Sequence, residues 1–154
     1  MRSTARGFSL IELMVVVAIT AIMAGLAAPS FKSFISGQRA KTAASDFVMA
    51  AIFARSEAIK RNANVTITPA TSGASGWKDG WSVAVGTTQL SRQQAYSGLT
   101  MSGPASAITY TGNGRLNAQV TTLTITGSDG SARCVAFDLS GMPKSTKSSS
   151  GTCS

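Results

Sequence analysis

Residues 8–28 read FSLIELMVVVAITAIMAGLAA, and this run decides how the rest of the chain is interpreted. Only Ser9, Glu12, Thr20 and Gly25 interrupt its apolar character. A helix of this length spans about 30 Å, which matches the hydrocarbon core of a bilayer. The run therefore predicts a membrane-length helix near the amino terminus.

The residues before this run, MRSTARG at positions 1–7, are few and basic, with Arg2 and Arg6. A secretory signal peptide has the same basic start, followed by an apolar stretch and a small-residue cleavage site. Residues 24–28 could imitate such a site. A cleaved signal and a plain membrane anchor are therefore both alternatives at this point.

Glu12 is the charged residue inside the apolar run. A charged side chain deep in a bilayer costs roughly 2.5–3.5 kcal/mol and marks a functional position with a partner to be found. Close to the membrane surface the cost is smaller, so a tolerated interfacial residue is the alternative. No Lys or Arg follows at helical spacing within the run, so the sequence shows no local basic partner.

The stretch from Gly7 to Met14, GFSLIELM, resembles the processing site of type IV prepilins and type II secretion pseudopilins. In that family a membrane-embedded prepilin peptidase cuts after the glycine and methylates the new amino terminus, and the apolar segment is kept as the filament core. The resemblance implies cleavage between Gly7 and Phe8, N-methylation of Phe8, and pairing of Glu12 with the Phe8 amine of a neighbouring subunit. Such pairing would supply the partner that Glu12 lacks within its own segment.

The resemblance also implies three segments: a cleaved leader at 1–7, a transmembrane and filament-core helix at 8–28, and an amphipathic helix half plus a globular head at 29–154. It places the leader in the cytoplasm, the helix across the bacterial inner membrane as a single span, and the head in the periplasm until the subunit enters a pilus or pseudopilus. Positive charges just after the span, such as Lys32, weakly favour the opposite orientation by the positive-inside rule. We follow the family pattern on this point.

Pro29 follows the apolar run and is interpreted as a kink in one long helix, with a simple helix stop as the alternative. Small and apolar residues recur at steps of three and four over 30–61, which predicts an amphipathic second half ending near Arg61. Asn62 and Asn64 are the predicted terminators. The recurring stripe comprises Ala40, Ala43, Phe47, Ala50, Ala51, Ala54 and Ala58. Alanines in this stripe allow a sheet to approach the helix closely.

After residue 64 the chain is rich in Thr, Ser, Gly and β-branched residues, and apolar and polar residues alternate. This pattern predicts strands separated by glycine-containing turns. The predicted strands cover residues 65–68, 81–85, 89–93, 107–111, 120–126 and 132–139. A helix followed by strands predicts an α+β head built as an antiparallel meander.

Three stretches resemble the GspH/FimT family of minor pilins and minor pseudopilins: ARSEAIKR at 54–61, GWKDGW at 76–81 and ITYTGNGR at 108–115. The resemblance implies the type IV pilin fold, in which one long kinked amino-terminal helix packs on an antiparallel β-sheet head. The two tryptophans of the second stretch are interpreted as loop and core anchors. Arg55 and Glu57 are interpreted as fixing the helix against the head.

The composition gives little support for an enzyme. The chain has 154 residues, of which 44% are hydrophobic and 13% charged, and it contains no histidine. Histidine is the commonest general base and metal ligand, and two cysteines alone do not complete a zinc site. We therefore expect no catalytic residue, no metal and no cofactor.

Cys134 and Cys153 are the two cysteines. In a domain translocated to the periplasm an even count favours a disulfide, with two reduced thiols as the alternative. A bridge that closes a loop of this size stabilises by roughly 3 kcal/mol. It would pin the polar tail from Lys144 to Ser150, which is otherwise expected to fray, to the strand that holds Cys134.

The formal net charge of +8 raises the question of nucleic-acid binding. Some members of the family are DNA receptors with a Gly-Arg-x-Arg motif in the tail region. The comparable stretch here is Gly141 to Lys144, GMPK, which lacks both arginines. Lys144 and Lys147 are left as candidates for a weak DNA contact, with no aromatic residues interleaved to stack bases. DNA is therefore a secondary candidate partner.

We interpret the chain as a minor type IV pilin that is processed by prepilin peptidase and helps initiate pilus assembly at or near the filament tip. Its expected partners are the peptidase, other minor pilins and the major pilin. One alternative is a GspH-like minor pseudopilin of a type II secretion system, with other pseudopilins as partners. The other is a DNA-binding minor pilin for natural transformation.

Overall fold

The computed structural model describes residues 8–138, 140–148 and 151–153. Within these ranges one long helix precedes a series of strands and a short 3-10 helix. Their bounds are α1 Leu10–Arg61, β1 Val65–Pro69, η1 Gly76–Asp79, β2 Trp81–Val85, β3 Thr88–Gln93, β4 Leu99–Ser102, β5 Ile108–Tyr110, β6 Leu123–Gly127, β7 Ala132–Phe137 and β8 Pro143–Ser148. The predicted α+β class is confirmed.

The end of α1 lies where the sequence predicts it. Asn62 adopts the left-handed conformation, with φ of 48°, which asparagine tolerates better than most residues. The Ala63 N–H donates to the Ala58 carbonyl and the Asn62 N–H to the Ile59 carbonyl, both at 3.2 Å. This pair of bonds is a Schellman motif, which satisfies the last carbonyls of the helix.

The chain divides into two compact units, the first ending at Phe34 and the second comprising Ile35–Ser154, called the head below. In the part of the chain that the structure describes, no unbroken helix meets the length and hydropathy of a membrane span by itself. The length and hydropathy of a membrane span are reached only when two segments, Leu10–Leu26 and Ser30–Arg61, are taken together. The helix is bent at the break between them, and this finding rests on length and composition alone. The side chains of residues 27–29 lie outside the description, so the kink at Pro29 and the segment boundary before it stay predictions.

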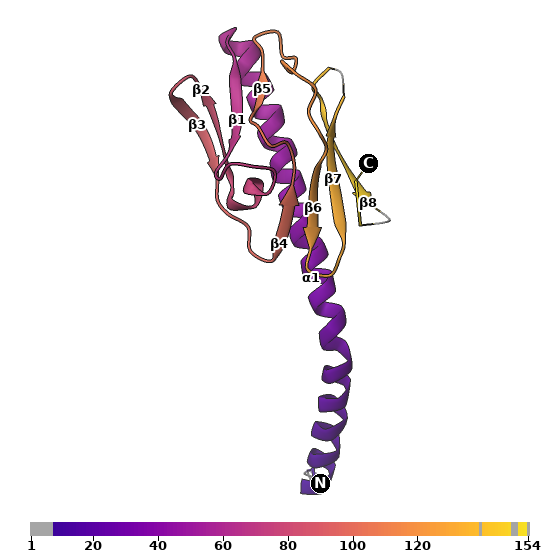
Figure 1. The fold of residues 1–154 in the computed structure, drawn as a ribbon. Coiled ribbons are helices and arrows are strands. Elements are labelled where there is room, and N and C mark those ends of the chain that lie inside the picture. The colour runs from indigo at the N-terminus through magenta and orange to yellow at the C-terminus, as the bar shows by residue number, and fades with distance from the viewer. Residues whose placement is uncertain (1–7, 139, 149–150, 154) are drawn as a thin grey trace, which may run out of the picture. The chain divides into compact units, whose positions relative to one another are not determined.

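Two four-stranded antiparallel sheets build the head, in the orders β3-β2-β1-β5 and β4-β6-β7-β8. Figure 1 shows both sheets against the carboxyl-terminal half of α1. The predicted single meander is wrong, because the chain crosses between the sheets: β4 pairs with β6, and β5 returns to pair with β1. Alternation identifies a strand but not its neighbour, which long-range packing selects.

Two strands were not predicted, and β6 begins at Leu123 and not at the predicted Val120. β4 buries Leu99 and Met101 and exposes the residue after each, but it is too short to stand out in the sequence. β8, PKSTKS, was expected to be a polar tail held to the strand of Cys134 by the disulfide alone, but it pairs with β7 along its whole length. The tail is thus attached to the strand of Cys134 as predicted, and the strand pairing, which needs no apolar pattern, is what the sequence did not reveal.

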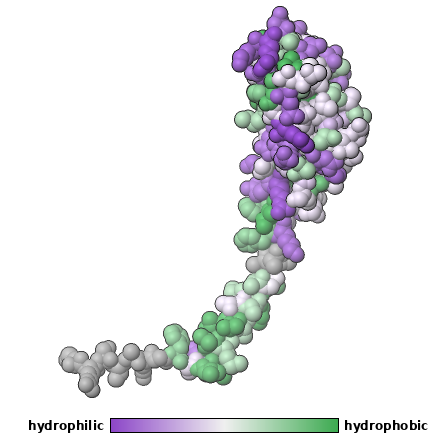
Figure 2. Space-filling model, turned by 90° about the vertical axis from the view of Figure 1, so that its left-hand side faces the viewer, coloured by the Kyte–Doolittle hydropathy of each residue, from purple (hydrophilic) through white to green (hydrophobic). Residues whose placement is uncertain are grey.

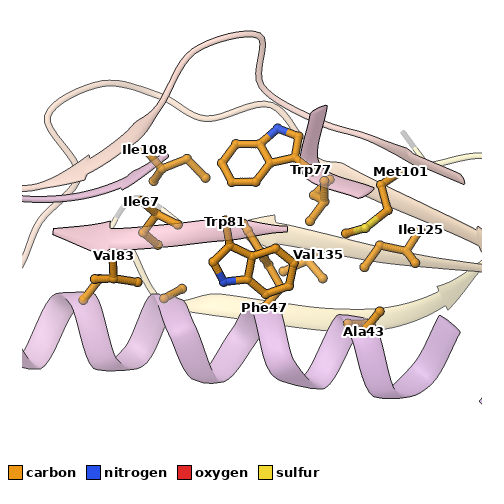
Figure 3. Close-up of a cluster of buried hydrophobic side chains, with 14 of the residues drawn as sticks. Ala43, Phe47, Ile67, Trp77, Trp81, Val83, Met101, Ile108, Ile125 and Val135 are labelled. Carbon is orange, nitrogen blue, oxygen red and sulfur yellow. The ribbon is translucent and has the colours of Figure 1, made fainter. Parts of the chain in front are cut away.

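The core of the head lies between α1 and the two sheets. Figure 3 shows Ala43 and Phe47 on the helix side of a cluster that includes Trp81 and Val83 from one sheet and Val135 from the other. The predicted helix stripe is buried except for the half-buried Ala50. Alanine therefore lets the sheets approach the helix, as the sequence predicted.

Both tryptophans are core anchors, as predicted. Trp77 and Trp81 are 0% and 2% exposed. The Phe47 ring packs edge-on against them, with centroid distances of 5.3 and 5.2 Å. The Trp77 indole N–H donates to the Pro104 carbonyl at 2.9 Å, so its polar atom is satisfied inside the core.

Candidate functional site

The amino-terminal segment from Phe8 to Leu26 exposes all of its side chains. Its large apolar residues are 51% to 84% exposed, and Figure 2 shows the hydrophobic colour gathered on this segment. A protein surface in water rarely carries a continuous apolar area of this size without a partner. The segment therefore requires lipid or another protein to cover it.

Ser9 and Glu12 form a reciprocal cap at the first turn of α1. The Glu12 N–H donates to Ser9 Oγ at 3.3 Å, and the Ser9 N–H donates to the Glu12 carboxylate at 3.4 Å. The pattern is a capping box, which satisfies backbone donors left free at a helix start. It is readable in the sequence as S-x-x-E, yet Ser9 is absent from the predicted site residues.

Glu12 forms no salt bridge within the described residues. Its two contacts with Ser9 are at the long end of hydrogen-bond distances, so the cap holds the carboxylate weakly. Gly7 lies outside the described residues, and the roles predicted for Gly7, Phe8 and Glu12 stay predictions.

Cys134 and Cys153 form the predicted disulfide, with their Cα atoms 5.6 Å apart. Cys134 lies in β7, and Cys153 lies in the segment that follows β8. The Ser148 hydroxyl donates to the Thr152 carbonyl at 2.6 Å, which ties this segment to the end of β8. The end of the chain is thus attached to the sheet by both a covalent and a polar contact.

Asp138 organises the turn before β8. Its Oδ1 accepts hydrogen bonds from the Ser140 hydroxyl at 2.7 Å and from the Ser140 and Met142 N–H groups at 2.8 Å. These bonds, led by that of the Ser140 hydroxyl, hold the pKa of Asp138 below its ordinary value, so the carboxylate stays charged at neutral pH.

Tyr110 contacts the same turn: its Oη donates to the Gly141 carbonyl at 2.6 Å, and burial raises the pKa of Tyr110. The sequence alone indicates no role for Asp138 or Tyr110, because their partners come from other turns and strands.

Arg55 joins α1 to the same turn. Its Nη1 lies 3.6 Å from the Met142 sulfur, and its charge contributes to the lowered pKa of Asp138. The Arg55 side chain therefore fixes the helix against the head, as interpreted from the sequence. The same interpretation is wrong for Glu57, which pairs with Arg61 at 2.7 Å and Lys60 at 3.6 Å within α1 itself.

Three cations lie on the hairpin of β7 and β8. Arg133 and Lys147 are directly opposite in the register of the two strands, so their side chains share one face of the sheet. Lys144 is three residues from Lys147 and therefore projects from the other face. No salt bridge involves these three residues in the described part of the chain. The two predicted DNA contacts thus lie on opposite faces, and Arg133 is a further cation of this hairpin that was not among the predicted site residues.

A family model described as type II transport protein GspH matches residues 43–141, which is more than half of the chain. The chain belongs to the GspH family. A second model, the prokaryotic N-terminal methylation motif, matches residues 2–28, which include the apolar segment and the capping box. The match covers the stretch in which the sequence shows the processing-site resemblance.

Two crystal structures of the Pseudomonas aeruginosa type IV minor pilin FimU are similar to this GspH-family chain. Their TM-scores are 0.61 and 0.64 at 21% and 20% sequence identity, and they cover 73% and 77% of this chain and 99% of each FimU chain. This likeness confirms the type IV pilin fold. None of the curated proteins compared with the chain matches it.

This GspH-family chain shares the type IV pilin fold with FimU. Within the described residues, no group of three His, Cys, Asp or Glu side chains comes together in a way that could hold a metal ion. What the site offers chemically is apolar surface, a weakly held carboxylate and a cationic hairpin.

Removing the disulfide is expected to lower the thermal stability of the head. Cys134→Ser with Cys153→Ser frees the end of the chain after β8, and a bridge with a sequence separation of 19 stabilises by roughly 3 kcal/mol. The melting temperature of the full chain in detergent, followed by circular dichroism, should fall by several degrees.

The matched control is Lys144→Ala with Lys147→Ala, which removes solvated charges from the same hairpin. Its stability should stay within about 0.5 kcal/mol of the parent. An unchanged melting temperature in the cysteine variant would show that pairing of β8 with β7 is sufficient without the bridge.

Proposed function

We propose that this protein is a minor type IV pilin that helps initiate pilus assembly as a subunit at or near the filament tip. The observation that carries the proposal is the exposed apolar segment from Phe8 to Leu26, which lies in the matched methylation motif. Glu12 within it has no salt bridge among the described residues. The pilin fold of the head supports the same conclusion.

Maturation would begin with prepilin peptidase, which would cut between Gly7 and Phe8 and methylate Phe8. The cut removes Arg2 and Arg6 with the leader and creates a positive amine at the start of the apolar segment. Burial of apolar side chains then drives the packing of this segment against other subunits, and each large side chain removed from water contributes about 1.5–3 kcal/mol of free energy.

The ion pair fixes how neighbouring subunits meet. Inside a filament core of low dielectric, an unpaired amine or carboxylate carries a desolvation cost of several kcal/mol. The Phe8 amine of one subunit and Glu12 of its neighbour offset this cost for each other. The weak Ser9 cap would occupy Glu12 until that amine arrives.

Before assembly the subunit would reside in the bacterial inner membrane, with one spanning helix and the head in the periplasm. The disulfide supports this localisation, because such bonds persist in oxidising compartments. On assembly the helix would pass from lipid into the filament, so its apolar surface stays covered. Other minor pilins and the major pilin would be its partners there.

The mature amino terminus tests the proposal. Mass spectrometry of the chain from membranes and from sheared pili should identify N-methylated Phe8 as the first residue. A start beyond Ala28 would identify an ordinary secretory signal and would exclude retention of the apolar segment as a filament core.

A minor pseudopilin of a type II secretion system is the second candidate, because the matched family is described as type II transport proteins. A pilin and a pseudopilin would undergo the same maturation steps, so the two functions are distinguished by the phenotype of a gene deletion. Deleting the gene should reduce surface pili if the protein is a pilin, and should reduce protein secretion if it is a pseudopilin.

A DNA-binding minor pilin is the remaining alternative, and the cations of the β7–β8 hairpin are the observation in its favour. Backbone contacts to DNA need several cations and are strongly salt-sensitive. With three cations on this hairpin, we expect only nonspecific binding of DNA, with dissociation constants of roughly 10⁻⁴–10⁻⁶ M at physiological salt. Binding of a short DNA duplex to the full chain, and its loss in the Lys144→Ala, Lys147→Ala variant, tests this alternative.

A further inference from the structure

Lys144 to Lys147 of β8 lie at the edge of a sheet, as far as the described strands show. The strand stands last in the order β4-β6-β7-β8 and, among the described strands, pairs with β7 alone. Figure 1 shows it at the outer side of the head. An edge strand presents unpaired backbone N–H and C=O groups, to which an extended segment of another chain can add.

This edge is cationic on both faces. Lys144 projects from one face, and Lys147 with Arg133 opposite it from the other. Like charges placed opposite each other are unfavourable unless an anion joins them. The carboxylates of the described head contact other residues: Asp46 contacts Tyr96, Glu57 Arg61, Asp79 Lys78, Asp129 Ser131, and Asp138 Ser140.

A second copy of this chain does not supply a complementary strand. None of the described strands, β1 to β8, contains Asp or Glu. Two β8 edges side by side would bring lysines close to lysines, which is how natural edge strands avoid pairing with themselves. The charges that repel a copy would attract an acidic segment, so the edge discriminates between partners.

We propose that the β8 edge binds an extended acidic segment of a different subunit of the same assembly, a partner assignment that rests on the proposed function. The segment adds to the sheet beside β8 and carries two acids three positions apart, one for each face. Backbone pairing supplies the attachment, and the two charge pairs with Lys144 and Lys147 select the partner.

A nucleic acid fits this edge less well than a strand does. β8 carries no aromatic side chain on which a base could stack. Lys144 projects away from Lys147 and Arg133, so one phosphate backbone running along a single face meets only part of the charge. A β-strand reaches both faces because its side chains alternate.

Short synthetic peptides test the proposal on the full chain in detergent micelles. The first is a fluorescent peptide of threonine and valine with two aspartates three positions apart. The second has the aspartates two positions apart, on one face, and the third has asparagines in their place. Anisotropy at low ionic strength should show the first binding about fivefold more tightly than the other two.

Variants locate the site. Lys144→Ala with Lys147→Ala should reduce binding of the first peptide to the level of the asparagine peptide. Lys144→Glu with Lys147→Glu should instead prefer a peptide with lysines at the two acidic positions. Arg92→Ala is the matched control, because it removes a cation from β3, the edge strand of the other sheet, and should leave binding unchanged.

Three results would overturn the proposal. Equal binding of the peptides with different aspartate spacing would show that no strand is added. An equal loss in the Arg92→Ala variant would show that net charge, and not the β8 edge, attracts the peptide. Tighter binding of a short DNA duplex, lost in the double alanine variant, would assign the hairpin to nucleic acid. None of these results changes the mature amino terminus, so the proposed function is judged separately.

Discussion

A Gly7→Leu chain is expected to stay uncut in the membrane, and the filament should contain none of it. The processing-site resemblance implies a peptidase that accepts a small residue before the cut, and leucine would not fit there. The uncut chain keeps Arg2 and Arg6 and has no free amine at Phe8. Immunoblotting of membranes and sheared pili should show only the longer precursor, in membranes alone.

A Ser3→Ala change is the matched control, because it alters the same leader away from the cut. It should be processed and assembled as the parent chain is. Normal maturation of the Gly7→Leu chain would place the cut elsewhere and would remove the basis for N-methylation of Phe8.

A Glu12→Ala chain should be cut and inserted normally but should be depleted from sheared pili by more than about tenfold. Removing one partner of a buried ion pair leaves the other charge uncompensated, at a cost of about 3–5 kcal/mol. Membrane insertion should not suffer, since the change makes the segment more apolar. Quantitative immunoblots of the membrane and pilus fractions measure the ratio.

Glu12→Gln separates the two contacts of this side chain. Glutamine preserves the capping box with Ser9, but it carries no charge for the neighbour's Phe8 amine. The variant should therefore fail to assemble as Glu12→Ala does. Normal incorporation of the glutamine variant would show that the cap at the start of α1, and not an interchain ion pair, is what assembly needs.

Much of the local structure could be predicted from the sequence. The end of α1 at Arg61 follows from the loss of helical periodicity and from Asn62, and β2 at Trp81–Val85 follows from alternation between glycines. The alanine stripe predicts which helix face is buried. These features depend on neighbours within a few residues, which is why periodicity reveals them.

Some residues of the candidate site can likewise be recognised from the local sequence, whereas others depend on contacts between distant segments. The processing-site motif, Glu12 and the cysteine pair are readable in the sequence, and so is the Ser9 cap, although it was missed. Arg133 acquires its significance only from lying opposite Lys147. Asp138 and Tyr110 likewise act through the turn before β8.

The sequence by itself determined the long helix, its apolar first part, its buried alanine face and most of the strands, because each is a periodic pattern of neighbouring residues. Only the tertiary structure decided that the strands form two sheets and that the polar segment PKSTKS is an edge strand. It also decided that three cations meet on one hairpin. Strand partners are selected by backbone hydrogen bonds and by packing between distant segments, and neither leaves a periodic signal in the chain.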